Sequence, residues 1–242
     1  MPCEKRTYRN TSPPDGLVRF DVLVQETDLS IYARYPMEAA ARELVLESRG
    51  IIEKYIQRFP HFAWTLSPWM IDGPVPRIIL KMTEAGKNAG VGPMAAVAGV
   101  VAEYVGRGLL TESEDVIVEN GGDIFIHASQ PVTVGILAGH SPLSRKLGVR
   151  LNANANAMAI CTSSGMVGPS LSMGLAEAVS IVSRSCPLAD AAATAVANHV
   201  QTKKDLQPAV DFARSISGVE GVVIIKGDAV AMWGDLDIVP IL

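Results

Sequence analysis

Residues 187–198 are the segment that most constrains what this chain can fold into. The segment reads Pro-Leu-Ala-Asp-Ala-Ala-Ala-Thr-Ala-Val-Ala-Asn. Alanine is the best helix former and proline is tolerated in a first helical turn, so the composition predicts a helix over about 187–200. Asp190 and Thr194 are four residues apart, which puts both oxygen-bearing side chains on one helical face. The other side chains around them are mostly methyl groups.

Two interpretations of this pair are open from the residues alone. Carboxylate and hydroxyl oxygens suit Mg²⁺, which completes its coordination with water and substrate phosphates. Alternatively, Asp190 is a first-turn charge that complements the helix dipole, and Thr194 bonds a carbonyl one turn back. The first interpretation gives a metal site, and the second gives only a stabilised helix.

Composition and charge limit the class of protein. The 242 residues are 48% hydrophobic and 19% charged, which indicates a globular chain long enough to bury a sizeable core. The net charge is -4 and Lys/Arg runs stop at two residues, so we expect no nucleic-acid partner. The three cysteines lack CxxC spacing, which argues against a disulfide framework or a zinc site. Without a signal segment or an 18-residue apolar stretch, we expect a cytoplasmic protein with no membrane partner.

Hydrophobic periodicity predicts alternating strands and long helices. Residues 1–16 are polar and contain prolines, so we expect a loosely held arm. Strands are predicted over 17–24, 29–33, 115–119, 124–127, 132–138, 157–162, 176–183, 221–225 and 229–233, and helices over 36–59, 76–89, 94–105, 187–200 and 205–216. No linker of different composition interrupts residues 1–242, which predicts one domain.

Two glycine-rich turns are candidates for ligand contact. Gly90-Val91-Gly92-Pro93 precedes the apolar helix predicted at 94–105, where free N–H groups either bind an anion or simply begin the helix. Asn120-Gly121-Gly122-Asp123 joins two predicted strands. It is either a tight hairpin turn or a place where a ligand approaches the backbone while Asp123 or Glu119 holds a polar group.

A third candidate follows the strand predicted over 157–162. Hydroxyl groups beside glycine in Thr162-Ser163-Ser164-Gly165 can donate to phosphate oxygens, although such clusters are also ordinary loop chemistry. Cys161 just before them is expected to be a buried, unreactive thiol, because its neighbours are apolar. His140 is expected in an exposed loop.

Taken in order along the chain, these motifs resemble the ApbE family of flavin transferases. The resemblance covers about residues 85–200, and the Ala-Asp-x-x-x-Thr-Ala helix is its most specific part. It implies that Asp190 and Thr194 are Mg²⁺ ligands. It also implies contacts to a flavin dinucleotide from Asn120, Gly121, Gly122, Asp123, Thr162, Ser163, Ser164 and Gly165.

The same resemblance implies a fold and an activity. The fold is α+β, of the T-fold-like ApbE type, with a mainly antiparallel sheet packed against long helices. The implied reaction is a Mg²⁺-dependent transfer of FMN from FAD to a protein Ser or Thr, with FAD as substrate or ligand. The implied partners are a flavin nucleotide and an acceptor protein, and a homo-oligomer is left open. The chain itself lacks the family's acceptor pattern.

This chain departs from the transferases at two places. Where they carry Lys-Gly-Tyr, it has Ala96-Val97-Ala98, and where they carry His-x-x-Asp-Pro, it has residues 168–172 with Pro169. A proline side chain cannot exchange a proton, so the expected base or flavin contact is missing there and the catalytic residues stay unassigned. The alternatives are a non-catalytic flavin or nucleotide binder of the same fold, and a structural or partner-binding protein. The sequence therefore indicates a divergent branch of this superfamily.

Overall fold

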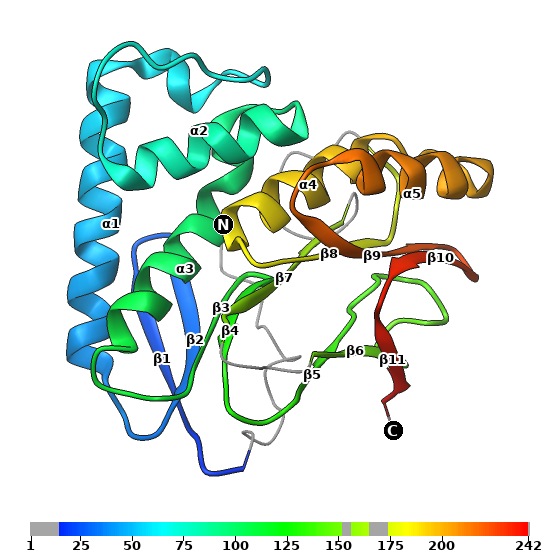
Figure 1. Cartoon of the computed structure of the whole chain (residues 1–242), viewed down its shortest axis with the longest axis horizontal. Helices are drawn as coiled ribbons and strands as arrows, with labels where there is room; N and C mark the ends of the chain where they lie inside the picture. Colours follow the sequence, from blue (N-terminus) through cyan, green and yellow to red (C-terminus); the bar gives the residue numbers. More distant parts are fainter. Residues whose placement is uncertain (1–14, 152–155, 165–173, 242) are drawn as a thin grey trace.

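A computed structural model describes residues 15–151, 156–164 and 174–241. Its main element is an eight-stranded antiparallel sheet with the order β1-β2-β3-β4-β7-β8-β9-β10. The strands are β1 Val18–Val24, β2 Thr27–Ala33, β3 Val116–Asn120, β4 Asp123–His127, β7 Met158–Ser163, β8 Ala178–Ser183, β9 Val219–Lys226 and β10 Ala229–Gly234. The helices pack on one face of this sheet and contribute to one apolar core there (Figure 1). The expected α+β fold is confirmed.

A smaller sheet covers the opposite face. It has the order β11-β6-β5, with β5 Val132–Gly135, β6 Leu147–Leu151 and β11 Asp237–Pro240. A second apolar core lies between the two sheets and includes Val149 of β6 and Ile160 of β7. Strands β6 and β11 were not predicted from the sequence, because glycine, arginine and proline interrupt their short apolar runs.

The helices follow the predicted segments closely. They are α1 Glu38–Arg58, α2 Arg77–Ala89, α3 Val97–Leu109, α4 Cys186–Asn198 and α5 Leu206–Ser215, with short 3₁₀ turns η2 Pro60–Ala63, η3 Pro93–Ala96 and η4 Lys203–Asp205. Within the described ranges, no single helix is long and apolar enough to cross a membrane. Helix α2 and the η3–α3 segment pass that test only as a pair bent by 108°.

Helix α4 lies at the centre of the helical layer. It packs against α2, α3, β7 and β8, and its alanines are almost completely buried. Small side chains on nearly every face let two helices and the sheet approach it closely. The alanine-rich composition of α4 is thus explained by its burial as well as by helix propensity.

Side-chain alternation along the central strands decides which groups face the helices. Phe125 of β4 and Ala159 of β7 belong to the core under the helices, whereas Ile124 and Ile160 belong to the core between the sheets. Successive strand residues point to opposite faces. Asp123, at the start of β4, therefore faces the helical layer.

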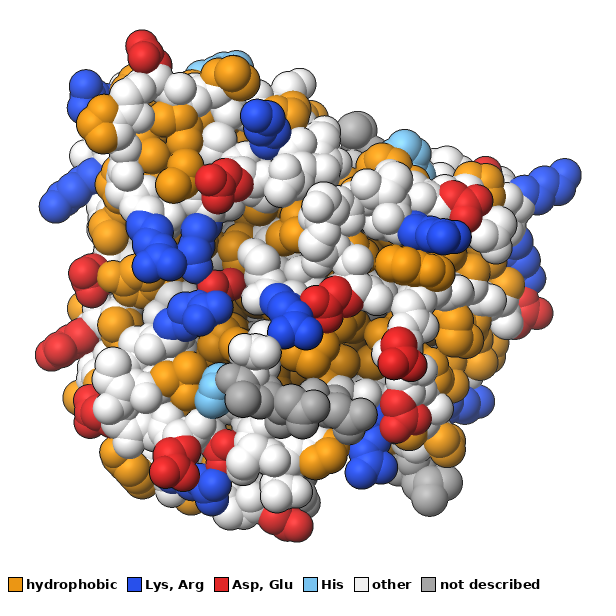
Figure 2. Space-filling view, in the orientation of Figure 1, with side chains coloured by type: hydrophobic (Ala, Val, Ile, Leu, Met, Phe, Trp, Pro, Cys, Tyr) orange, Lys and Arg blue, Asp and Glu red, His pale blue; other side chains and the backbone are white. Residues whose placement is uncertain are grey.

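Charges on the outer surface are mixed. In Figure 2, basic and acidic side chains are interspersed over the viewed face, and hydrophobic side chains lie between them. Opposite charges are therefore neighbours on that face.

Candidate functional site

The candidate site lies where the first turns of α3 and α4 meet the β3–β4 hairpin and strand β7. Asp190 of α4 marks its centre, because its carboxylate Oδ2 accepts the backbone N–H of Gly99 at 2.8 Å. Gly99 is the third residue of α3, and an N–H at that position has no partner within its own helix. Asp190 therefore caps the start of the neighbouring helix α3, which neither sequence interpretation had anticipated.

Gly99 is required for this contact. A Cβ atom at position 99 would lie 2.5 Å from the carbonyl oxygen of Cys186 and 2.9 Å from the Cβ of Asp190. Both distances are far below van der Waals contact, so only glycine lets the two helices approach this closely. The signal in the sequence is a glycine inside an otherwise apolar helix, and sequence reasoning missed it.

The Asn-Gly-Gly-Asp segment forms a tight hairpin turn between β3 and β4. Gly121 and Gly122 have φ values of 70° and 112°, in the region that favours glycine. The N–H of Gly122 donates to Glu119 Oε1 at 3.2 Å, and its carbonyl accepts the N–H of Thr162 of β7 at 3.1 Å. The turn interpretation is confirmed, while the flavin contacts expected of these residues stay predictions.

Asn120 links the hairpin to α3. Its side-chain amide Nδ2 donates to the carbonyl oxygen of Ala98 at 3.0 Å. Ala98 and Gly99 are neighbours, so α3 begins with one residue held by Asn120 and the next held by Asp190. The hairpin and α4 thereby fix the start of α3 from two sides.

Asp123 and Asp190 are buried acids that influence each other. Burial, together with the charge of Glu119, raises the pKa of Asp123 to about 7, against a hydrogen bond with Cys161 that lowers it. Burial and the charge of Asp123 also raise the pKa of Asp190 well above its usual value, against the N–H groups of Gly99 and Ala98. Two carboxyl groups whose charges repel each other gain from a cation, which would relieve that repulsion.

Two thiols are influenced by the charges of this acid pair. Cys161 Sγ is 3.6 Å from Cys186 Sγ and donates to the Cys186 carbonyl oxygen at 3.4 Å. Both cysteines are free and fully buried, and burial is the largest cause of their raised pKa values. A protonated, buried thiol is a poor nucleophile.

The Thr-Ser-Ser-Gly segment splits between the two faces of the sheet. Thr162 points away from the helices, and its Oγ1 lies 2.8 Å from Ser180 Oγ. Ser163, next along β7, is buried, and its Oγ has no hydrogen-bond partner among the described residues. Ser164 is half-buried at the end of the strand. The remaining predicted residue, Gly165, and also Pro169, lie outside the described residues.

The donor chemistry of the site fits a hard cation. Thr194 is half-buried one turn beyond Asp190 on α4, and Asp123 adds a second carboxylate on the facing strand. These are oxygen ligands, as Mg²⁺ prefers. No group of three or more His, Cys, Asp or Glu side chains is placed to hold a metal ion in the described ranges. A cation at Asp190 and Thr194 would therefore need backbone oxygens, water or ligand phosphate to complete its coordination.

The four histidines of the chain occupy other parts of the molecule. His61 is in η2, and His140 follows β5. His127, which contacts the Glu114 carbonyl at 3.1 Å, is at the far end of β4 from Asp123. His199 ends α4, at the end opposite Cys186. An imidazole base at Asp190 is thus absent from the described part of the chain.

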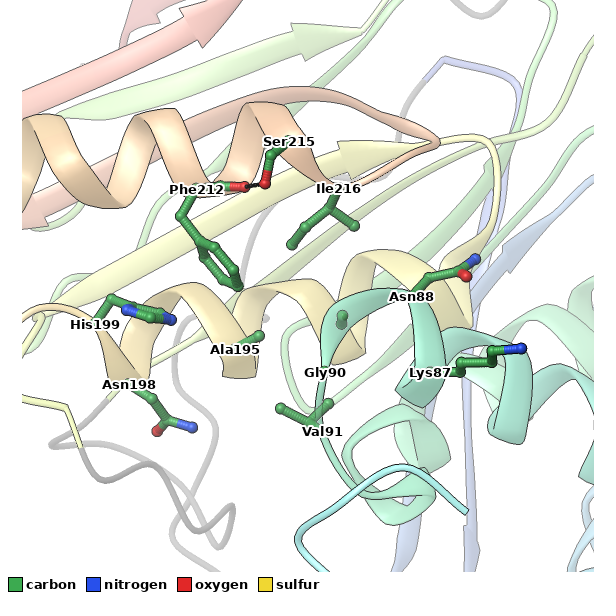
Figure 3. Close-up of a pocket in the computed structure, with 11 residues that line it drawn as sticks. Lys87, Asn88, Gly90, Val91, Ala195, Asn198, His199, Phe212, Ser215 and Ile216 are labelled. Carbon is green, nitrogen blue, oxygen red and sulfur yellow. Dashed lines mark hydrogen bonds between the residues drawn. The ribbon is translucent and has the colours of Figure 1, made fainter. Parts of the chain in front are cut away.

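A separate pocket of about 420 Å³ lies at the other end of α4. Figure 3 shows Ala195 and Asn198 of α4 and the following residue His199 on one side, Phe212 of α5 above them and Val91 opposite. The ring centroids of His199 and Phe212 lie 4.2 Å apart. None of the residues predicted from the family resemblance lines this pocket.

Comparison with known proteins gives consistent matches over most of the chain. A protein-family model described as AbpE bacteria matches residues 9–229. The UPF0280 protein of Methanosarcina acetivorans is 37% identical over 214 residues, covering 87% of this chain and 84% of that protein. The UPF0280 protein of Methanocaldococcus jannaschii is 36% identical over 201 residues, covering 81% of this chain and 82% of that protein.

Solved structures show the same fold at low sequence identity. The apo form of the flavinyl transferase ApbE of Pseudomonas stutzeri aligns with a TM-score of 0.58 at 12% identity, covering 90% of this chain and 94% of that one. The ApbE protein of Thermotoga maritima aligns with a TM-score of 0.54 at 15% identity, covering 89% of this chain and 96% of that one. The ApbE-type architecture expected from the motifs is confirmed.

Proposed function

Since this chain belongs to the family described as AbpE bacteria, we propose that it binds FAD with Mg²⁺ and transfers FMN to a hydroxyl group of an acceptor protein. The observation that carries this proposal is the Asp123–Asp190 acid pair at the start of α3. Buried acids with raised pKa values are more frequent at functional sites than in ordinary cores.

Named residues have distinct roles in this proposal. Asp190 and Thr194 would hold Mg²⁺, which neutralises charge on a bound diphosphate. Gly121 and Gly122 leave the hairpin backbone open to a ligand, because neither has a side chain over the turn. The buried Ser163 hydroxyl, which lacks a partner among the described residues, supplies a hydrogen-bond donor for a phosphate oxygen.

The transfer would break the phosphoanhydride bond of FAD and form a phosphoester bond to the acceptor, whose hydroxyl proton is released. The acceptor oxygen forms a bond to the FMN-side phosphorus, the bond to the AMP phosphate breaks, and AMP leaves. The proposal is supported by the fold, which this chain has in common with proteins whose names describe flavin transferases.

A second candidate, a flavin nucleotide binder without transferase activity, is favoured by one observation. No histidine is among the described groups that bond to Asp190 or influence its charge, so the described site lacks an imidazole to accept the proton of the acceptor hydroxyl. Such a protein would keep the nucleotide intact.

One experiment separates these candidates. FAD is incubated with the purified protein and a peptide carrying the family's acceptor pattern, in Mg²⁺ or in EDTA, and the products are separated by chromatography. Metal-dependent release of AMP with FMN joined to the peptide supports the transferase. Intact FAD that co-elutes with the protein supports the binder, and intact FAD that does not co-elute contradicts both.

A further inference from the structure

Helices α3 and α4 each use a carboxylate to cap the first turn of the other. Asp190 of α4 accepts the N–H of Gly99 at the start of α3. In return, Glu103 of α3 accepts the N–H of Cys186, the first residue of α4, through its Oε2 at 3.0 Å. Each helix thus supplies the cap for the N-terminus of the other, and the two caps lie on either side of the Gly99–Cys186 contact.

Glu103 is itself held firmly. Its Oε1 accepts from Lys81 of α2 at 2.6 Å and from Arg107, one turn further along α3, at 2.8 Å. The Glu103 side chain is only 3% exposed, while Lys81 and Arg107 reach it from the partly exposed side. Burial opposes the charge of Glu103, but the bonds from the two cations outweigh it and lower the pKa.

We propose that Glu103 is a positioning residue for the cation and nucleotide site, because it fixes the first turn of α4 and thereby the carboxylate of Asp190. This inference rests on the proposed function. Glu103 does not touch the bound groups itself. It acts through the backbone of Cys186, four residues before Asp190 on the same helical face.

The isosteric change Glu103→Gln tests this role. Glutamate uses both oxygens as acceptors, one for the two cations and one for Cys186, but glutamine has only one acceptor oxygen. Its amide NH₂ must therefore face either the cations or the Cys186 N–H. If the NH₂ faces Cys186, the cap of α4 is lost, and if it faces Lys81 and Arg107, the bonds that hold Glu103 in place are lost.

Asp115→Asn is the matched control. Asp115 is another buried acid, which accepts from the Ser129 N–H at 2.6 Å and pairs with Arg34. It precedes β3, at the end of that strand opposite Asn120. The control therefore disrupts a comparable buried ion pair without touching α3 or α4.

Hydrogen exchange of the Gly99 amide, read by NMR, is the first measurement. We expect Glu103→Gln to speed this exchange at least tenfold, with the β8 amides as an internal reference, and Asp115→Asn to leave the ratio unchanged. Should the glutamine variant fold poorly, Lys81→Met removes one anchor and should give a smaller change in the same direction. Equal Gly99 exchange in wild type and in the variants of Glu103 and Lys81 would overturn the inference.

The second measurement is the Kd for Mg²⁺ in the presence of FAD, by calorimetry. We expect about a tenfold increase in Glu103→Gln and no change in the control. If the wild type binds no Mg²⁺, the proposed function fails, and faster Gly99 exchange still supports the positioning of Asp190 by Glu103. If the wild type binds Mg²⁺ and Glu103→Gln binds it equally well, the positioning role is wrong while the proposed function stands.

Discussion

Asp190 is the residue on which the metal interpretation depends most directly. It has two roles in the structure, since it caps α3 through Gly99 and faces the second acid Asp123. A cap of this kind contributes about 1 kcal/mol, and the repulsion between buried charges offsets part of it. The structural and ligand-binding roles of Asp190 therefore make different predictions for one substitution.

We expect Asp190→Asn to fold and to lose the stabilisation by Mg²⁺. For the wild type, Mg²⁺ at about 100 times its Kd contributes about 2.7 kcal/mol. In a chain of this size that stabilisation raises Tm by about 5–10 °C. Thermal melts with and without Mg²⁺ measure the difference, with Asp211→Asn on the exposed face of α5 as control. A lower Tm for Asp190→Asn with an unchanged Mg²⁺ shift would favour the cap-only role.

Asp123 makes the stability of the folded protein, and its response to Mg²⁺, depend on pH. Its pKa is raised to about 7 in the folded chain from a model-peptide value near 4, so the folded state binds more protons across that range. Stability from this group is therefore greatest below about pH 4 and is lost as the pH rises through 7. Mg²⁺ binds the ionised form, so the Mg²⁺ effect should grow in the same interval.

We expect Asp123→Asn to flatten this dependence. Without Mg²⁺, the variant should be more stable than the wild type at pH 8, by at most ~4 kcal/mol, and closer to it at pH 5. Denaturant unfolding at both pH values measures the difference. A wild type whose stability relative to Asp123→Asn does not change between pH 5 and pH 8 would contradict the raised pKa.

At the scale of elements, the contact between α3 and α4 depends on one missing side chain. Gly99→Ala would place a methyl group 2.5 Å from the Cys186 carbonyl oxygen and must separate the helices. We expect a loss of about 2 kcal/mol or more in the free energy of unfolding, together with weaker Mg²⁺ binding.

Gly50 provides the matched control for that change. It lies inside α1, and a Cβ there would meet no atom within 4 Å. Gly50→Ala should therefore stabilise the protein by about 0.5–1 kcal/mol through helix propensity alone. Urea unfolding compares the two variants. Equal effects at positions 50 and 99 would show that the close approach of α3 and α4 is not energetically important.

The helices were predictable from the sequence because their periodicity is local. The helix predicted over 187–200 corresponds to α4, and the one predicted over 205–216 corresponds to α5. Strands β6 and β11 were missed because they are stabilised by pairing with each other across some ninety residues of sequence, as in Arg150 with Asp237. Their own residues show weak alternation.

For the whole molecule, the sequence predicted the ingredients of the site but not its geometry. Asp190, Asn120 and Asp123 were singled out, and the structure brings them together around the start of α3. The exchange of caps between Glu103 and Asp190 involves residues more than eighty positions apart, so no local pattern could indicate it. Thr162 was grouped with its neighbours, although strand alternation turns its side chain to the other face.

The most direct test of this account is equilibrium binding of FAD to the full chain, measured by flavin fluorescence anisotropy in Mg²⁺ and in EDTA. The account predicts saturable binding in Mg²⁺ that weakens at least a hundredfold in EDTA or in Asp190→Asn, while Asp115→Asn binds like the wild type. Equal FAD binding with and without Mg²⁺, or no binding by the wild type, would contradict a metal-dependent flavin nucleotide site at Asp190.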